Sequence, residues 1–344
     1  MRRSIRISLA FAAGVALFAL ALYGIDLGEV RGHIARSDWR YLAGGGVLYL
    51  FAYVVRSARW RLILRPITRV GLRDSFFMLM AGYFLNYVIP IRAGELAKSF
   101  FLKRLKGVPI ATSLPTVYVD KLFELVSIVF VVVAIPVFSI RVEGPLAALI
   151  YSVLGIFLFG LVILVLAFRK GDAATKILCG LFAWLPKGPR NRLTHWITLF
   201  VEGMGVAREN VRTLLPLTGL TVAAVLIDAA YFLMMFRAFD ISVPYLAVLF
   251  GYTLLTLSYI LPTPPAQIGY NEFVIRLIFA GGIGVAAIPK SEVMAVIIVA
   301  HALTGLLITG VGVGSFAAMG IRVSESFRAT VEQPSDTCEA TEHP

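Results

Sequence analysis

Residues 86–95 read NYVIPIRAGE and residues 261–272 read LPTPPAQIGYNE, and both carry the same order of helix-breaking residues. In each stretch an apolar run reaches proline, then glycine, then glutamate. Proline ends a helix because it lacks an amide donor and clashes with the preceding turn, whereas glycine permits the backbone to reverse. Glutamate suits the positively polarised first turn of a new helix. The residues predicted to break the helices are Pro90, Gly94, Pro262, Pro264 and Gly269.

The apolar runs before the two breaks, Ser75–Ile91 and Tyr245–Leu261, lead directly into proline and polar sequence. The hydrocarbon core of a bilayer is ~30 Å thick and takes about 20 helical residues to cross. We therefore expect both runs to form half-spans that turn back inside the membrane. Runs that suit a full span are Ile7–Tyr23, Tyr41–Val55 with its flanks, Ile110–Phe138, Leu146–Phe168, Leu214–Phe236 and Val293–Met319.

The composition agrees with a membrane protein. The 344 residues are 59% hydrophobic and 15% charged, whereas soluble globular domains carry about 25% charged residues. Disordered chains are poor in apolar residues, and the two cysteines, Cys179 and Cys338, are too few for a disulfide scaffold. The fold class predicted is all-α: a polytopic helical bundle with about six full spans and two re-entrant broken hairpins, arranged as an inverted repeat.

The positive charge predicts the orientation of the chain. The net charge of +12 would indicate nucleic-acid binding in a soluble protein, but in a membrane protein it marks cytoplasmic loops. Arginines and lysines gather before the first span, after the second span, after residue 102 and after Phe168. We expect both termini in the cytoplasm, one hairpin entering from each side of the cell membrane, and no nucleic-acid partner. Alternatively, Ile7–Tyr23 is a cleaved signal peptide with Ala19 and Ala21 at its cleavage site.

Residues 1–320 are expected to form one transmembrane domain. Within it, residues 169–212 form a cytoplasmic loop whose apolar residues recur at helical spacing beside basic flanks, which indicates helices on the membrane surface. This loop either docks on the cytoplasmic face or recognises anionic headgroups. Residues 321–344 are polar, and we expect a disordered tail.

Each predicted break carries a pair of opposite charges. Arg92 precedes Glu95 by three residues, and Arg276 follows Glu272 by four, a spacing that favours a contact along one helix. Ionisable groups at membrane depth pair with each other or face a water-filled cavity. Two matching broken hairpins point to inverted repeats around a central binding site. The alternative is that these are ordinary helix ends whose charges reach the interface.

Several motifs of the chain resemble one known family. Residues 56–64 read RSARWRLIL, residues 118–124 read YVDKLFE, and both occur with the two broken stretches. Together they resemble the lysylphosphatidylglycerol synthase transmembrane-region family, also described as flippase-like, from about Arg2 to Gly320. This sequence departs from the family where Lys121 replaces a common arginine and where Ala266 and Gln267 replace two common glycines.

The resemblance implies movement of a lipid or lipid-linked anionic intermediate between leaflets, in some relatives within hopanoid or polyprenyl-linked pathways. Arg92 and Arg276 would hold the anionic headgroup, while the nearby glutamates position the arginines or couple the movement to protons. The chain ends at Pro344, so we expect no aminoacyl-transferase domain and no lysine transfer. The predicted substrate-binding residues are Arg59, Asn86, Arg92, Glu95, Asp120, Lys121, Glu124, Glu272 and Arg276.

Other chemistry finds little support in the sequence. The chain lacks the H-E-x-x-H, C-x-x-C and G-x-S-x-G motifs, so we expect no metal, no cofactor and no catalytic residue. Two alternatives stay open: a membrane-embedded transferase on polyprenyl-linked substrates with Asp120, Glu124 or Glu95 as base, and a scaffold for lipid-biosynthesis enzymes. Asp228 and His301 lie within predicted spans, where each either faces a cavity or makes a polar contact between helices.

Overall fold

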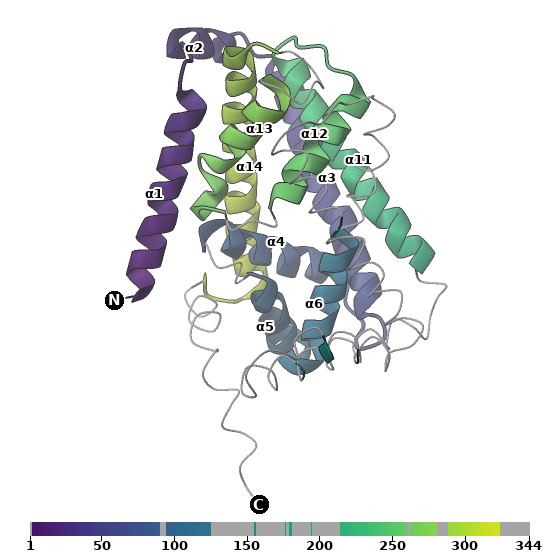
Figure 1. Cartoon of the computed structure of the whole chain (residues 1–344). Coiled ribbons are helices and arrows are strands. Elements are labelled where there is room, and N and C mark those ends of the chain that lie inside the picture. The colour runs from purple at the N-terminus through teal and green to yellow at the C-terminus, as the bar shows by residue number, and fades with distance from the viewer. Residues whose placement is uncertain are drawn as a thin grey trace, which may run out of the picture.

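The computed structural model describes residues 2–89, 94–124, 155, 176, 179–180, 194, 214–259, 263–280 and 288–323, and each element in these ranges is a helix. Figure 1 shows them as a bundle. The helices, with the labels of that figure, are α1 (Arg2–Leu22), α2 (Leu27–Ala35), α3 (Trp39–Leu64), α4 (Leu72–Val88), α5 (Gly94–Lys106), α6 (Ile110–Glu124), α11 (Leu214–Ala238), α12 (Tyr245–Ser258), the 3₁₀ turn η2 (Pro265–Gln267), α13 (Tyr270–Ala280) and α14 (Lys290–Met319).

Three of the described helices are long and apolar enough to cross a membrane: Trp39–Leu64, Leu215–Ala238 and Lys290–Met319. A fourth span is possible by length if Phe11–Leu22 and Leu27–Ala35, which meet at 87°, count as one bent unit. The all-α fold class is thus confirmed. The count of six full spans stays a prediction, because Ile110–Phe138 is described only as far as Glu124 and Leu146–Phe168 lies outside the described residues. The predicted cytoplasmic loop and tail lie almost wholly outside them too.

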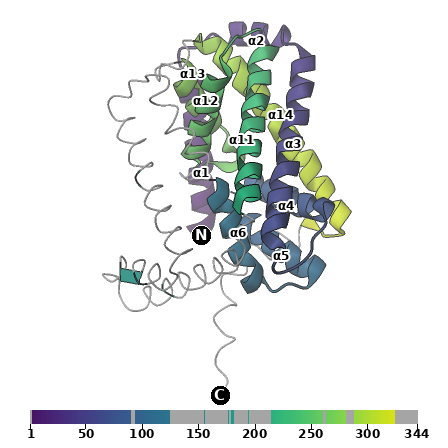
Figure 2. The same cartoon turned by 90° about the vertical axis from the view of Figure 1, so that its right-hand side faces the viewer.

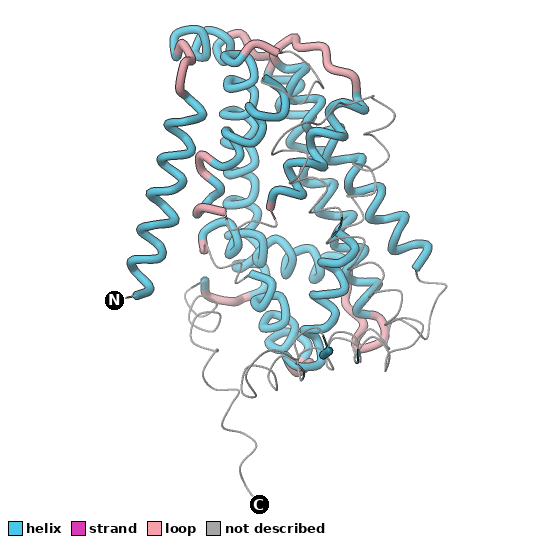
Figure 3. The backbone as a smooth tube through the Cα atoms, in the orientation of Figure 1, coloured by secondary structure: helices cyan, strands magenta, loops and turns pink. Residues whose placement is uncertain are grey.

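Each predicted break lies between two helices, α4 and α5 for the first and α12 and α13 for the second. In Figure 1, α12 and α13 occupy the upper half of the bundle, and α4 and α5 lie in its lower half. Figure 3 shows the loop segments that join η2 and α13 near mid-height. The two pairs of helices therefore lie toward opposite ends of the bundle, and they meet where α4 contacts η2.

Long helices hold the two hairpins together. Helices α3 and α11 pack along each other, and they lie side by side in both Figure 1 and Figure 2. Helix α14 runs the height of the bundle and packs against α4 of the first hairpin and α13 of the second. One helix is thus shared by both hairpins.

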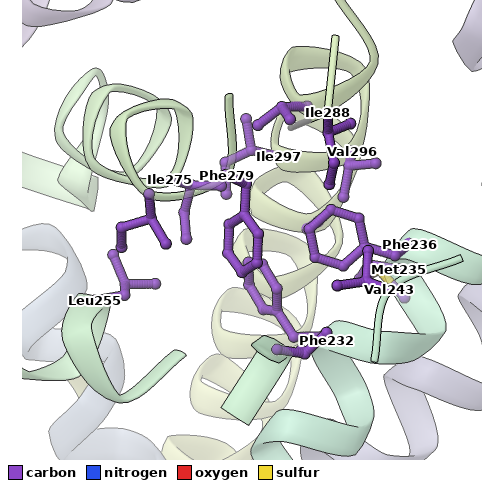
Figure 4. Packing of buried hydrophobic residues seen from close by; sticks show 14 of the residues in the cluster. Phe232, Met235, Phe236, Val243, Leu255, Ile275, Phe279, Ile288, Val296 and Ile297 are labelled. Carbon is purple, nitrogen blue, oxygen red and sulfur yellow. The ribbon is translucent and has the colours of Figure 1, made fainter. Parts of the chain in front are cut away.

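The apolar core is divided between the two ends of the bundle. The larger cluster joins α11, α12, α13 and α14, with Phe232, Phe236 and Phe279 at its centre (Figure 4). The second cluster joins α3, α4, α5 and α14 around Trp60 and Phe101. Close-packed aromatic side chains of this kind fix helix positions because each buries a large apolar area.

Local sequence signals set the helix ends. The side chain of Asp26 accepts hydrogen bonds from the amides of Gly28 and Glu29 and so caps α2. Helix α14 ends at Gly320, whose φ of 66° is left-handed. The sequence predicted that the first apolar run would extend to Ile91, but α4 ends at Val88. Ile89 is extended (φ −101°, ψ 120°) because the ring of a following proline disfavours the helical conformation.

The first hairpin closes on two glycines. A Cβ atom on Gly94 would overlap the carbonyl oxygen of Gly82, and it would lie 2.8 Å from the side-chain oxygen of Asn86. A Cβ on Gly82 would in turn lie 3.0 Å from the carbonyl oxygen of Gly94. Backbones of α4 and α5 therefore touch with no side chain between them. This close approach is possible only for glycine at residue 94.

We predict that Gly94→Ala destabilises the protein by about 1–3 kcal/mol, the usual cost of overpacking. The added methyl meets backbone of α4, which is not free to shift. Thermal unfolding in detergent measures the change. Gly71→Ala is the matched control, because Gly71 has φ −66° and nothing within 4 Å of an added Cβ. Equal melting temperatures for the two variants would contradict the close packing of α4 on α5.

Candidate functional site

Six ionisable side chains from three helices gather beside the tip of the first hairpin. We call them the central charge cluster: Arg59 of α3, Glu95 and Lys98 of α5, and Asp120, Lys121 and Glu124 of α6. The cluster holds three cations and three carboxylates, so its formal charge is zero. Its members pair across helices, and Lys98 Nζ lies 6.0 Å from the ring centre of Trp60, which belongs to the second core cluster.

The pair of Arg59 and Asp120 lies at the buried end of the cluster. The two residues are 1% and 2% exposed. Arg59 Nε donates to Asp120 Oδ1 at 2.8 Å, and its Nη1 donates to the hydroxyl of Thr221 at 3.2 Å. A buried charge is tolerated only where such partners satisfy it. The sequence predicted Arg59 as a substrate-binding residue, and the structure places its side chain in the interior.

Lys98 links α5 to the buried pair. Its Nζ lies 3.0 Å from Glu95 Oε2 and 3.7 Å from Asp120 Oδ2. It also lies 5.3 Å from the centre of the Tyr83 ring, within the range of a cation–π contact. Lys98 is 1% exposed, so its charge depends on these neighbours.

Lys121 is the most exposed charged side chain of the cluster. It pairs with Glu124 on the next turn of α6 and lies 4.0 Å from Glu95 Oε1. Its side chain is 42% exposed, against 22% for Glu95 and 19% for Glu124. The hydroxyl of Tyr83 donates to Glu124 at 2.9 Å. Lys121 is therefore the most accessible cation of the cluster.

Asn86 joins the broken ends of the first hairpin. Its side-chain oxygen accepts a hydrogen bond from the amide of Gly94 at 2.8 Å, and its amide nitrogen donates to Glu95 Oε1 at 3.4 Å. Asn86 thereby caps the N-terminus of α5 from the end of α4, which satisfies an amide that has no partner within its own helix. The predicted substrate-binding residues Asn86 and Glu95 are thus brought together.

A second buried ion pair lies between α3 and α11. Arg56 donates to Asp228 through both guanidinium arms, and Tyr252 donates to Asp228 Oδ2 at 2.8 Å. Arg56 also lies over the ring of Tyr53, 5.2 Å from its centre. From the sequence, Asp228 either faces a cavity or makes a polar contact between helices. The structure shows the polar contact.

The second hairpin is held by a different pair, Glu272 and His301. Glu272 Oε2 accepts a hydrogen bond from the amide of Gly269 at 2.8 Å, which caps α13. Glu272 Oε1 lies 2.5 Å from His301 Nδ1, and His301 Nε2 lies 2.8 Å from the carbonyl oxygen of Ala266. His301 of α14 therefore contacts both the turn before α13, at Ala266, and the first turn of α13, at Glu272.

These contacts determine how many protons the pair holds. A carbonyl oxygen only accepts, so His301 Nε2 must carry a hydrogen to meet Ala266. The contact of Nδ1 with Glu272 also needs a hydrogen, because two lone pairs repel at 2.5 Å. The pair thus holds two protons in all, and its net charge is zero whichever atom of the contact carries the second one.

Three residues of the turn before α13 have left-handed backbone: Ala266 (φ 52°), Gln267 (φ 58°) and Gly269 (φ 78°). The first two stand where two glycines are common in the family that the sequence resembles. A side chain in this region crowds the following carbonyl, which costs roughly 1–2 kcal/mol per residue. At Gly269 a Cβ would also overlap the carbonyl oxygen of Gly14, so α1 lies directly on the turn.

Arg276 lies away from Glu272. Its Nη1 donates to the carbonyl oxygens of Leu20 at 2.9 Å and Ala21 at 2.6 Å, the last turn of α1. The contact with Glu272 expected from their spacing is therefore replaced by a link between α13 and α1. Arg92, Pro90 and Pro262 lie outside the described residues, so their predicted roles are untested.

A groove of about 490 Å³ opens between α1, α13 and α14. Phe18, Ile268 and Leu306 form apolar walls, and the pair of Glu272 and His301 lines its floor. Tyr87 of α4 also lines the groove, with its ring 6.4 Å from that of His301. Within the described residues no three His, Cys, Asp or Glu side chains gather to hold a metal ion.

The sequence prediction missed Lys98 and Arg56 as members of these sites and did not predict the partner of His301. Lys98 stands three residues after Glu95, a spacing that signals a pair on one helix face. Arg56 carries no such signal, because its partner is 172 residues away. His301 was noted in the last span, but its contact with Glu272 follows only from the packing of α14 on α13.

Comparison with known proteins confirms the resemblance inferred from the sequence. The sequence model of the lysylphosphatidylglycerol synthase TM region matches residues 5–312. The chain is 22% identical over 315 residues to a UPF0104 membrane protein of Methanothermobacter thermautotrophicus, which covers 87% of this chain and 88% of that protein. No solved structure matches the chain.

Two further relatives share only part of their length. The chain is 26% identical over 162 residues to the UPF0104 membrane protein MJ1595 of Methanocaldococcus jannaschii, covering 45% of this chain and 48% of that protein. It is 29% identical over 118 residues to the glycosyltransferase AglD of Haloferax volcanii, covering 33% of this chain. The match spans 18% of AglD, so most of that protein has no counterpart in the alignment.

We predict that Ala266→Gly stabilises the protein by about 1 kcal/mol, because glycine relieves the left-handed strain at this residue. Thermal unfolding in detergent measures the shift. Ala302→Gly is the matched control, since Ala302 lies inside α14, where glycine costs about 1 kcal/mol relative to alanine. The two identical substitutions should therefore act in opposite directions. A lower melting temperature for both variants would rule out the strained turn.

Proposed function

Because this chain belongs to the lysylphosphatidylglycerol synthase transmembrane-region family, we propose that it moves an anionic lipid, or a lipid-linked anionic intermediate, between the leaflets of a membrane. The observation that carries this proposal is the central charge cluster, which lies at the tip of a broken hairpin inside an apolar bundle. Ionisable groups at such a depth are expensive and mark pathways for polar substrates.

The balance of the cluster supports an exchange of ion-pair partners. Three cations meet three carboxylates, so an entering phosphate takes a cation only by displacing a carboxylate, and the displaced carboxylate then needs a hydrogen-bond donor in place of that cation. Phosphate oxygens accept charge-assisted hydrogen bonds from lysine as carboxylates do. Lys121 makes the first contact because it is the most exposed cation, and Lys98 follows because it shares Glu95 with Lys121.

Glu95 has the central part in this exchange. Its two oxygens face the two lysines, at 3.0 Å from Lys98 and 4.0 Å from Lys121. A headgroup that takes both lysines displaces Glu95 toward Asn86, which already donates to it. The first hairpin thereby responds to the substrate through a residue in the first turn of α5.

The membrane and the orientation that we propose follow from the positively charged loops. They favour a cytoplasmic membrane with both termini inside the cell, as the sequence predicts. The substrate is then a lipid of that bilayer, and lipid-biosynthesis enzymes are the partners expected to supply it.

A second candidate function is transfer of a sugar to a polyprenyl-linked acceptor. It is favoured by the similarity of 118 residues to a protein that is named a glycosyltransferase. Asp120 or Glu124 would act as base, although Asp120 is held by Arg59 and Lys98 in this structure. Formation of a labelled product by the purified protein with a labelled sugar donor would favour this function over lipid movement.

We predict that Glu95→Gln lowers the rate of lipid movement about tenfold, because a neutral amide no longer holds the two lysines in place for exchange. The assay reconstitutes the full-length protein in vesicles of phosphatidylglycerol and phosphatidylethanolamine and follows leaflet exposure of a labelled phosphatidylglycerol. Glutamine has nearly the size of glutamate, so we expect the variant to fold. Elution of the variant as a single species checks this.

Asp74→Asn is the matched control. Asp74 pairs with Lys106 at 2.9 Å, and both side chains are more than 30% exposed. An exposed ion pair contributes only ~0–1 kcal/mol, so neutralising it should leave the rate within about twofold of the parent. A rate unchanged by Glu95→Gln would overturn the proposed role of the cluster.

A further inference from the structure

We infer that the groove between α1, α13 and α14 binds a hydrocarbon chain of the lipid whose headgroup meets the central charge cluster. The inference rests on the proposed function for the identity of the lipid. It adds a second site, with its own residues and its own chemistry, to the charged one.

The wall that α14 contributes is suited to hydrocarbon. Ala302, Leu306 and Thr309 follow one another at spacings of four and three residues, so they lie on one helix face, and all three are exposed. Leu306 is 73% exposed. Leucine that is exposed in a membrane bundle faces lipid, and a polar ligand would gain nothing from it.

The groove is hollowed by small residues. Gly305 lies between Ala302 and Leu306, and a Cβ atom on it would come within 2.6 Å of the Tyr87 hydroxyl. Because Gly305 has no side chain, the side chain of Tyr87 lines the groove at this position. On the opposite side, Phe18 of α1 and Ile268 close the groove with apolar surface.

The polar residues at the floor of the groove do not favour a charged ligand. Glu272 and His301 satisfy each other, and their remaining polar atoms meet Gly269 and Ala266. The pair has no net charge at this proton count, so it offers no counter-ion to a phosphate or an ammonium group. Arg276, the other charged residue of α13 near α1, donates to the carbonyl oxygens of Leu20 and Ala21.

One turn of α4 separates the groove from the charge cluster. Asn86 contacts Glu95 and Gly94 of the first hairpin, while the adjacent Tyr87 lines the groove. Successive residues of a helix point about 100° apart, so this single turn borders both sites. A lipid with its headgroup at the cluster and one chain in the groove crosses the end of α4.

Photolabelling tests the inference without any measurement of transport. The full-length protein is placed in vesicles of phosphatidylglycerol and phosphatidylethanolamine that contain phosphatidylglycerol with a diazirine on one acyl chain. After irradiation, peptide mass spectrometry locates the label. We expect the label on residues 298–309 in excess of that around Val313, which lies on the same helix, is 45% exposed and does not line the groove.

Ala302→Trp should fill the groove and lower labelling of residues 298–309 about fivefold, because it removes the space for several methylene groups. Val313→Trp is the matched control and should leave that labelling within about twofold. If Ala302→Trp fails to elute as a single species, Thr309→Trp at the exposed edge serves in its place. Equal label around residues 302–309 and Val313, or labelling unchanged by the groove variants, would overturn the inference.

The outcomes also separate this inference from the proposed function. Groove labelling that is blocked by Ala302→Trp, in a protein whose lipid movement is unaffected by Glu95→Gln, would support the chain site and reject the charge cluster as a headgroup site. Lipid movement that depends on Glu95, with no preferential label in the groove, would reject the chain site alone.

Discussion

The pairing of Arg59 with Asp120 is the interaction on which the lower half of this bundle depends. Removing one partner of a buried ion pair leaves an unpaired charge and costs about 3–5 kcal/mol. Arg59 comes from α3 and Asp120 from α6, and Lys98 of α5 shares the same carboxylate. Three helices are therefore oriented by one aspartate. Because Lys98 also pairs with Glu95 in the first turn of α5, this aspartate is linked to the helix that follows the first break.

The two hairpins use different residues to satisfy the free amides at a helix start. Both begin a helix in the interior, where the first amides have no intrahelical partners. In the first hairpin Asn86 supplies an oxygen to Gly94 from the preceding helix. In the second, Glu272 supplies it to Gly269 from within the new helix, and His301 fixes the carboxylate. The first helix start consequently lies beside several ion pairs between helices, whereas the second is held by one carboxylate and one histidine. Two similar sequence breaks thus carry unlike contacts.

The sequence predicted the breaks because proline, glycine and glutamate act locally. The ends of α4 and the start of α5 follow from residues within ten positions of each other. Asn86, Glu95, Asp120, Lys121 and Glu124 were predicted for the site, and the structure brings them together. Partners that depend on helix packing were not predicted. Arg276 was assigned to Glu272 by spacing, yet the pairing of Glu272 is set by α14, which places His301 29 residues away in sequence against it. Spacing along one helix carries no information about a neighbouring helix.

The link between Arg276 and α1 has a consequence for how the protein is made. The carbonyl oxygens at the end of α1 are met by an arginine 255 and 256 residues further along the chain. At a synthesis rate of about 5–20 residues per second, α1 is complete roughly 10–50 s before that arginine exists. During this interval those carbonyl oxygens cannot have this partner. The contact that ties α1 to α13 therefore forms long after α1 has been synthesised.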